Sequence, residues 1–327
     1  MSLNALSRKP ETSALAAKRL LVGRGAPLAP EEGLAAIETL AAAGDADALA
    51  TLATLRGAGA WTHHSWPEAM DLLTEAAELG SIEARTQLII LTPDRDLAAH
   101  VRAGDESSPD RWRKLKDSID LHAWVTPPAP AQVCDIPRVW VAEKFVTTAF
   151  CNWLVTRTYD RFKPALMRDN TTGVSRALDT RTCTDFMFDV LDGGIMMLLL
   201  RVKISNITSI PVPHMEPPQL FHYALGEEIK PHRDVLLDGE RGYGEDGTYT
   251  GDRVATFLMY LNDGYEGGET EFPVAGFRFK GRAGDAMFFG NYRDKKPDPA
   301  ALHSAAPVTR GEKFIFSQWI HNRPFQA

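Results

Sequence analysis

The chain has 327 residues, of which 44% are hydrophobic and 24% are charged, and this usage is typical of a globular protein. At about 100–200 residues per domain, such a length suggests two domains. Lys and Arg number 36 against 43 Asp and Glu, which gives a net charge of −7. This balance argues against the basic surface that nucleic-acid binding requires, so we expect no nucleic-acid partner.

Three features of the sequence favour a cytoplasmic protein without a membrane partner. The first residues, MSLNALSRKPETSALAAKRL, lack the apolar core of a signal peptide. The longest strongly apolar run, residues 195–200, is too short to span a bilayer. The cysteines, Cys134, Cys151 and Cys183, are odd in number and widely spaced, so they predict no disulfide framework.

Residues 1–120 are predicted to form an α-helical repeat domain. The segment GDADA at 44–48 recurs as GSIEA at 80–84, 36 residues later. Gly44 and Gly80 suit left-handed helix C-caps, and Ser65, Pro67 and Glu68 form a helix-start pattern. Ala48, Leu49, Leu52 and Leu55 would share one helical face. A period of about 34–40 residues is typical of tetratricopeptide-type solenoids.

The segment AAELGSIEA resembles the Sel-like branch of that superfamily. Solenoids commonly bind other proteins, so the repeats are candidates for substrate recruitment. The alternative is a helical cap that only packs on the second domain. Three prolines within residues 127–130 predict an extended linker near the boundary.

Residues 121–327 are predicted to form the second domain, with supporting helices at 143–157 and 195–205. Several short strands follow, separated by Gly and Pro turns. Their ranges are 219–226, 229–236, 253–261, 267–272, 286–289, 302–308 and 311–320. This succession predicts a double-sheet jelly roll, and the fold class is therefore α+β with two domains.

Two of these strands carry candidate metal ligands. His232 and Asp234 would leave the same face of an extended backbone, and His303 supplies a second imidazole. Two His and one carboxylate form the donor set of non-haem Fe(II) oxygenases, although zinc hydrolases also use it. By strand alternation, Lys313 and Trp319 share a face with Ile315 and Ser317, so Lys313 could neutralise a carboxylate of a dicarboxylic acid.

Four stretches together resemble the prolyl 4-hydroxylase branch of the 2-oxoglutarate- and Fe(II)-dependent dioxygenases. They are EPPQLFHYALGEEIKPHRD, DRVATFLMYLNDGYEGGETEF, GRAGDAMFF and LHSAAPVTRGEKFIFSQWI, and the resemblance covers about residues 136–325. It implies a double-stranded β-helix and a need for Fe(II), 2-oxoglutarate and O₂, with ascorbate as a further expected reductant. The implied reaction is the hydroxylation of a C–H bond, with succinate and CO₂ as coproducts. The favoured substrate is a prolyl residue in a protein or peptide.

The resemblance also implies roles for individual residues. His232, Asp234 and His303 would be the iron ligands and catalytic residues, and Lys313 would pair with the C5 carboxylate of 2-oxoglutarate. Tyr223 and Tyr260 match positions that hydrogen-bond or line this cosubstrate. One departure is Ile229, which stands where the family often has a second tyrosine.

Three alternatives stay open. The substrate could be a free amino acid or another small molecule, in which case the repeats would serve another purpose. A zinc hydrolase would require a general base and no equivalent of Lys313. A non-catalytic interaction scaffold would be expected to have lost its ligands, and all of them are present in the sequence.

Several further segments and side chains could take part in function, and most of them are expected to be structural or to lie in loops. The Gly-rich segment 238–251 is predicted to be a mobile lid, the alternative being a surface connection without a role. His214 and Glu216 lie among prolines and predict a loop rather than a ligand pair. His222 is expected to be structural, Trp319 either walls the pocket or packs in the core, and His321 is expected to be exposed. His63 and His64 are expected to lie in a loop between repeat helices.

Overall fold

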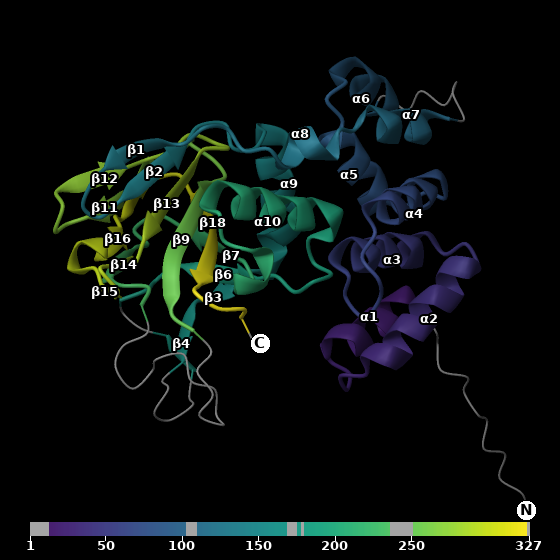
Figure 1. The fold of residues 1–327 in the computed structure, drawn as a ribbon, viewed down its shortest axis with the longest axis horizontal. Coiled ribbons are helices and arrows are strands. Elements are labelled where there is room, and N and C mark those ends of the chain that lie inside the picture. The colour runs from purple at the N-terminus through teal and green to yellow at the C-terminus, as the bar shows by residue number, and fades with distance from the viewer. Residues whose placement is uncertain (1–12, 103–109, 169–174, 178–179, 236–250, 326–327) are drawn as a thin grey trace, which may run out of the picture. The chain divides into compact units, whose positions relative to one another are not determined.

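The computed structural model describes residues 13–102, 110–168, 175–177, 180–235 and 251–325 (Figure 1). The chain divides into two compact units, residues 1–124 with 189–200 and residues 125–188 with 201–327. A helical N-terminal region is thus followed by a sheet-rich region, as the sequence predicts. Among the described residues, no helix combines the length and the apolar content that a membrane crossing needs. The predicted lid lies, except for Gly251, outside the described residues.

Helices make up the described regular structure of the first 125 residues. The helices α2 and α4 begin 36 residues apart, and so do α3 and α5, so the repeat found in the sequence is a repeat of helix pairs. Gly44 and Gly80 follow α2 and α4 with φ angles of +83° and +103°, the left-handed conformation predicted for them. The bounds are α1 (Ala14–Val22), α2 (Pro30–Ala42), α3 (Ala46–Ala58), α4 (Trp66–Glu78), α5 (Ile82–Leu91), α6 (Arg95–Arg102), α7 (Arg111–Ser118) and α8 (Leu121–Val125).

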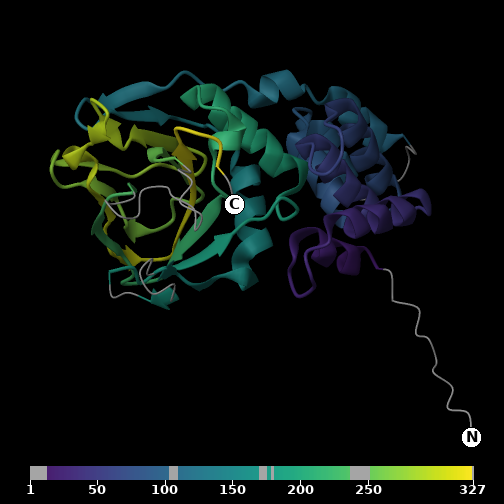
Figure 2. The same ribbon diagram turned by 60° about the horizontal axis from the view of Figure 1, so that its bottom comes forward.

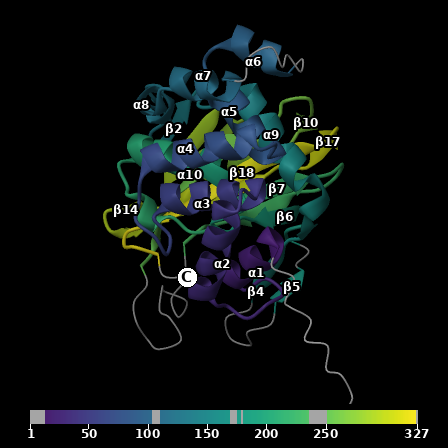
Figure 3. The same cartoon turned by 90° about the vertical axis from the view of Figure 1, so that its right-hand side faces the viewer.

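Helix α3 is the most enclosed helix of the first unit's repeat and lies beside α4 (Figures 1 and 3). The four residues of its predicted apolar face are buried, but most of the other side chains are buried as well. The reason is that α1, α2, α4 and α5 all contact α3. The sequence analysis predicted one apolar face for this helix, but a helix that is covered on all sides has no exposed polar face opposite to it.

Helix α10 (Gly194–Thr208) begins within the first unit. The backbone N–H of Met196 donates to Oε1 of Gln87 at 3.2 Å. A Cβ atom added to Gly57 would lie 3.1 Å from Cδ1 of Leu198, so this glycine permits close packing. These contacts explain why residues 189–200 join the helical unit although they stand far from it in the sequence.

Two β-sheets form the second unit, and their strands surround its interior (Figure 2). Within the described ranges, the larger sheet has the order β1-β2-β13-β9-β18-β7-β6-β3 and the smaller sheet the order β12-β11-β16-β8. Short two-stranded pairs, β4-β5, β10-β17 and β14-β15, lie outside these sheets. The bounds of the larger sheet are β1 (Ala131–Cys134), β2 (Val139–Ala142), β3 (Lys163–Pro164), β6 (Thr184–Met187), β7 (Gln219–Tyr223), β9 (Arg253–Tyr260), β13 (Ala286–Gly290) and β18 (Lys313–His321).

The remaining elements complete this unit. The smaller sheet consists of β8 (Ile229–His232), β11 (Thr270–Phe272), β12 (Phe277–Phe279) and β16 (His303–Ala305). The short pairs comprise β4 (Leu166–Arg168), β5 (Ser175–Ala177), β10 (Glu266–Gly267), β14 (Tyr292–Arg293), β15 (Lys296–Pro297) and β17 (Val308–Arg310). Besides α10, the helices are α9 (Thr148–Thr158) and the 3₁₀ turns η1 (Tyr159–Arg161), η2 (Val212–His214) and η3 (Pro299–Ala301).

Strand β18 is buried along its whole length, including its polar residues Lys313, Ser317, Gln318 and His321. It pairs with β9 on one side and with β7 on the other, so neither edge is exposed. Such a central strand presents one face to the interior of the unit, and this face carries the residues of the candidate site.

Candidate metal centre

The register of β8 and β16 brings the two predicted histidines together. His232 ends β8, His303 begins β16, and the two are directly paired across the antiparallel ladder. Their ring centroids are 4.3 Å apart. Asp234 follows β8 in a bend rather than on the strand. Its Oδ1 lies 3.6 Å from Nε2 of His232, and its Oδ2 lies 3.5 Å from Nε2 of His303. One ligand atom from each residue lies within 4.8 Å of the others, which is a separation that a shared ion can bridge.

Backbone carbonyls fix both imidazole rings in the orientation that metal binding needs. Nδ1 of His232 lies 2.9 Å from the carbonyl oxygen of Lys230, and Nδ1 of His303 lies 3.0 Å from that of Ala301. A carbonyl only accepts hydrogen bonds, so each Nδ1 carries the proton. The lone pair of each Nε2 is then directed toward the shared centre, as in protein metal sites generally.

The Asp234 carboxylate is buried and oriented by a strand of the larger sheet. Thr256 of β9 donates its hydroxyl to Oδ2 of Asp234 at 2.7 Å, and Asn291 donates to the same hydroxyl oxygen at 3.1 Å. Burial alone would raise the pKa of Asp234, but the neighbouring imidazoles of His303 and His232 and the hydrogen bond from the Thr256 hydroxyl lower it overall. The carboxylate therefore carries its charge at neutral pH.

Burial, together with the neighbouring His303, lowers the pKa of His232 to about 4. The ring is then neutral at physiological pH, which is the form that coordinates a metal. Two imidazoles and one carboxylate, with no further ligand from the described residues in this cluster, suit Fe(II) with open positions.

Lys313 lies in the same cavity as the metal cluster. It begins β18 opposite Tyr223 of β7, and its side chain is only 1% exposed. Its Nζ donates to the carbonyl oxygen of Gly268 at 2.8 Å and lies 4.7 Å from the centroid of the Tyr223 ring. Burial lowers the pKa of Lys313 to about 7, because desolvation disfavours the charged ammonium group more than the nearby negative groups favour it.

Both sheets contribute to the wall of this cavity, including the four residues that alternation places on one face of β18. The lining residues are Arg181, Phe221, Tyr223, Ile229, His232, Asp234, Thr256, Leu258, Thr270, His303, Ser304, Ala305, Lys313, Ile315, Ser317 and Trp319. A cavity with convergent polar groups and perturbed pKa values is the arrangement expected of a binding site.

Of the two tyrosines predicted to contact the cosubstrate, one lines the cavity and the other lies behind its wall. Tyr223 lines the cavity, and burial raises its pKa well above the ordinary value. Tyr260 is fully buried behind the wall, where its hydroxyl lies 2.8 Å from that of Thr270. Thr270 lines the cavity, so Tyr260 acts on the wall through this contact. Ile229, the departure noted in the sequence, also lines the cavity.

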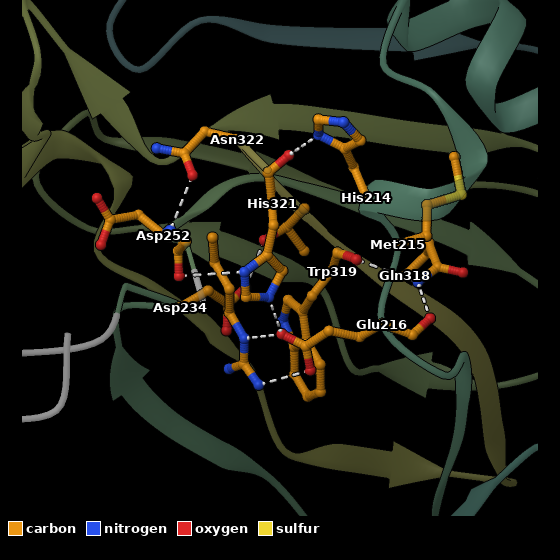
Figure 4. Close-up of polar contacts among 12 residues, drawn as sticks. His214, Met215, Glu216, Asp234, Asp252, Gln318, Trp319, His321 and Asn322 are labelled. Atoms are coloured by element: carbon orange, nitrogen blue, oxygen red, sulfur yellow. Dashed lines mark hydrogen bonds and ion pairs between the residues drawn. The ribbon is translucent and has the colours of Figure 1, made fainter. Parts of the chain in front are cut away.

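A buried ion-pair cluster lies near the cavity and was not predicted (Figure 4). The Glu216 carboxylate accepts from Nη2 of Arg253 at 2.9 Å and lies 2.6 Å from Nε2 of His321. The Arg253 guanidinium in turn lies 4.0 Å from the centroid of Trp319, which lines the cavity. The expectation that His321 is exposed is wrong: it is 2% exposed because β18 continues through it.

His214 and His222 take structural positions. Nδ1 of His214 lies 3.1 Å from the carbonyl oxygen of His321, and Glu216 serves the ion-pair cluster rather than a metal. The His222 ring stacks on Phe314 at 4.7 Å between centroids, on the strand face opposite Tyr223. No local sequence pattern predicts the Glu216 cluster, because Glu216 and His321 are 105 positions apart in the chain.

Comparison with known proteins places this geometry in a family. The sequence profile described as "2OG-Fe(II) oxygenase superfamily" matches residues 218–321, which include all three candidate ligands and Lys313. Probable prolyl 4-hydroxylase 3 of Arabidopsis thaliana is 32% identical over 247 residues, covering 69% of this chain and 80% of the relative. The chain belongs to the prolyl 4-hydroxylase family of 2OG-Fe(II) oxygenases.

Another curated relative and one solved structure are also similar to this chain. Prolyl 4-hydroxylase 5 of Arabidopsis thaliana is 29% identical over 253 residues, covering 71% of this chain and 81% of the relative. Among solved structures, the viral collagen prolyl hydroxylase of Paramecium bursaria Chlorella virus-1 aligns with a TM-score of 0.43 and 23% identity, over 57% of this chain and 98% of that chain. As a prolyl 4-hydroxylase family member, the protein is a dioxygenase that uses Fe(II), 2-oxoglutarate and O₂.

Proposed function

We propose that this protein hydroxylates a prolyl residue in a protein or peptide, with 2-oxoglutarate converted to succinate and CO₂. The observation that carries the proposal is the convergence of His232, Asp234 and His303 in one cavity with the buried ammonium group of Lys313. The family assignment supports the reaction class, and the names of the Arabidopsis relatives support a prolyl substrate.

In this proposal, His232, Asp234 and His303 hold Fe(II). When bound, the iron activates O₂ for oxidation of an unactivated C–H bond. The chain contributes the ligand geometry: carbonyls orient the imidazoles, and the Thr256 hydroxyl orients the carboxylate. Because three protein ligands leave open positions, cosubstrate and O₂ have room to bind.

Lys313 is proposed to bind the distal (C5) carboxylate of 2-oxoglutarate. Its ammonium group carries three donors, and the described residues engage one of them, at the Gly268 carbonyl. Tyr223 flanks the ammonium group, while Tyr260 supports the wall through Thr270. A carboxylate beside the lysine would compensate the charge that burial otherwise disfavours.

The larger and the smaller sheet are proposed to form a double-stranded β-helix, with the cavity between them. Residues from β7, β9 and β18 on one side and from β8, β11 and β16 on the other line this cavity, and this supports the arrangement. The apolar lining residues, among them Phe221, Leu258 and Trp319, would exclude water from the reacting atoms.

Residues 1–120 are proposed to be a Sel-like repeat domain that recruits the substrate protein to the catalytic domain at 121–327. The offset of 36 residues between helix pairs supports a repeat of this kind. We also propose a cytoplasmic location, supported by the free thiols of Cys134, Cys151 and Cys183, and ascorbate as a reductant that maintains ferrous iron.

A peptide assay tests the proposed reaction. Purified protein with Fe(II), 2-oxoglutarate and a library of proline-containing peptides is analysed by mass spectrometry for the gain of one oxygen atom and for succinate. We expect both products from the wild-type protein and neither from His232→Ala. His222→Ala is the matched histidine control, because this ring lies outside the cavity, and it should retain turnover. Oxygen gain only on free amino acids would overturn the prolyl-peptide proposal.

A further inference from the structure

We propose that Asn291 is a positioning residue for the metal ligand Asp234, on which it acts through the hydroxyl group of Thr256. Neither the sequence pattern nor the comparisons single out this asparagine. It lies directly after β13, it is 1% exposed, and it is not one of the residues that line the cavity. The inference rests on the proposed function, since it concerns how firmly the cluster holds Fe(II).

The hydrogen bonds of Asn291 determine which way its side-chain amide is turned. Its Nδ2 lies 3.3 Å from the carbonyl oxygen of Arg253. A carbonyl oxygen only accepts hydrogen bonds, so the NH₂ group and not the amide oxygen must face it. The same Nδ2 lies 3.1 Å from Oγ1 of Thr256. An NH₂ group carries two hydrogens, and these two contacts use one each.

This donor fixes the direction of the hydrogen bond between Thr256 and Asp234. A hydroxyl group has one hydrogen, and the oxygen of this hydroxyl already accepts from Asn291. Its own hydrogen is therefore left for Oδ2 of Asp234, which lies 2.7 Å away. A hydroxyl turned the other way would direct a lone pair at the buried carboxylate and repel it. The relay Asn291–Thr256–Asp234 thus runs in one direction, from the amide to the metal ligand.

The surroundings of Asn291 hold it in place at a cost in free energy. Its backbone N–H donates to the carbonyl oxygen of Val254 at 2.9 Å, and its own carbonyl accepts from the backbone N–H of Asp298 at 2.9 Å. Its amide oxygen Oδ1 is buried, and no described residue donates to it. Buried polar atoms nearly always have a partner, and an unpaired one is costly. A task for the two amide hydrogens in orienting the metal ligand explains why an asparagine occupies this position.

A double-mutant cycle tests whether Asn291 acts through Thr256. The full-length variants Asn291→Leu and Thr256→Val, and the variant that carries both changes, are titrated with Fe(II) without oxygen against a chromophoric chelator. We expect Asn291→Leu to weaken Fe(II) binding about tenfold, because the leucine donates no hydrogen bond to the residue that orients the ligand. In the protein that already carries Thr256→Val, the same substitution should change the affinity by less than about twofold, because the relay is broken there.

Asn262→Leu is the matched control, because the Asn262 amide also bonds backbone groups but lies outside the cavity and the relay. Its Nδ2 donates to the carbonyl oxygen of Glu312, and its Oδ1 accepts from the N–H of Phe314. This variant should melt at a lower temperature than the wild type and bind Fe(II) equally tightly. If Asn291→Leu does not fold, Asn291→Ala takes its place in the cycle with the same expected result.

Two outcomes would overturn the inference and leave the proposed function intact. One is equal Fe(II) affinity of the wild type and the Asn291 variant. The other is a double variant in which the two losses of affinity multiply, because the residues would then act independently. A wild-type protein that fails to bind Fe(II) would instead contradict the proposed function.

Discussion

The chemistry of the site depends on a few side chains whose protonation is set by burial. His232 is neutral because its ring is desolvated, whereas Asp234 keeps its charge because imidazoles and a hydroxyl surround it. Lys313 sits near the midpoint of its titration at neutral pH. Each of these states follows from the environment that the two sheets create, and each gives a measurable consequence.

The hydroxyl of Thr256 should determine how tightly the metal is held. Thr256→Val keeps the shape of the side chain but removes the hydrogen bond to Asp234, so Fe(II) affinity should fall about 10–100-fold. Thr256→Ser retains the hydroxyl and should bind the metal nearly as the wild type does. Competition titration with a chromophoric chelator measures both. Equal affinities in the wild type and the valine variant would mean that the hydroxyl does not orient the carboxylate.

The affinity for 2-oxoglutarate should depend on pH through Lys313. The free protein loses the ammonium charge as pH rises through about 7, whereas the bound carboxylate requires that charge. The dissociation constant should therefore rise by about tenfold for each pH unit well above 7. Calorimetric titrations between pH 6 and 8.5 cover this range, in which neutral His232 does not titrate.

Lys313→Arg is the matched variant, because a guanidinium stays charged throughout this range. Its affinity for 2-oxoglutarate should be nearly independent of pH. If the lysine protein and the arginine protein show the same slope, another group is responsible for the pH dependence.

The buried Glu216 carboxylate should stabilise the fold at neutral pH. Burial raises its pKa, but the hydrogen bond from His321 and the charge of Arg253 outweigh this and lower it overall. A lowered pKa contributes stability above the ordinary value of about 4.3 and loses it as pH falls through the lower value of the folded protein. Glu216→Gln should therefore lower the free energy of unfolding by about 3 kcal/mol at pH 7.

Urea unfolding at pH 7 and below pH 4 measures this effect, and the difference from the wild type should shrink in acid. Glu266→Gln is the control, since the pair of Glu266 with Arg310 is exposed and should contribute less than about 1 kcal/mol. A Glu216 variant as stable as this control at pH 7 would show that the buried cluster does not stabilise the fold.

At the scale of elements, the long central strands and the repeat helices are the parts that sequence patterns predict well. The predicted strands at 253–261 and 311–320 correspond to β9 and β18, because a run of apolar residues is sufficient for a strand buried on both faces. The convergence of the candidate ligands also follows from strand placement, although Asp234 lies in a bend after β8.

Other elements could not be predicted because no local signal specifies them. Strands such as β3 and β6 have only 2 and 4 residues, which is too short for a period to show. The Glu216 cluster depends on a contact between two residues 105 positions apart, Glu216 and His321. The association of residues 189–200 with the helical unit is likewise a long-range effect.

Removal of residues 1–124 should therefore damage helix α10. Its first half carries Ile195, Met196 and Leu199, which are buried, and residues 189–200 belong to the helical unit. The truncated chain 125–327 would expose these apolar side chains to water, so we expect aggregation or a clearly lower melting temperature. Analytical gel filtration and thermal unfolding measure this. A monomeric fragment that melts at the temperature of the full chain would contradict the expectation.

At the scale of the whole molecule, composition and periodicity predict a helical region followed by a sheet-rich region, and this order is confirmed. The two compact units of the structure are residues 1–124 with 189–200 and residues 125–188 with 201–327, so neither unit corresponds to a single cut of the sequence. The reason is physical: a linker rich in prolines marks where the chain becomes extended, but domain membership is decided by packing.

A reaction under ¹⁸O-labelled dioxygen tests most directly whether this molecule is an oxygenase that couples its two substrates. The protein is incubated with Fe(II), 2-oxoglutarate and a prolyl peptide, and both products are analysed by mass spectrometry. One labelled atom should enter the new hydroxyl group of the peptide and the other should enter succinate, in equal amounts. Oxygen taken from water, or peptide oxidation that does not require 2-oxoglutarate, would contradict the account.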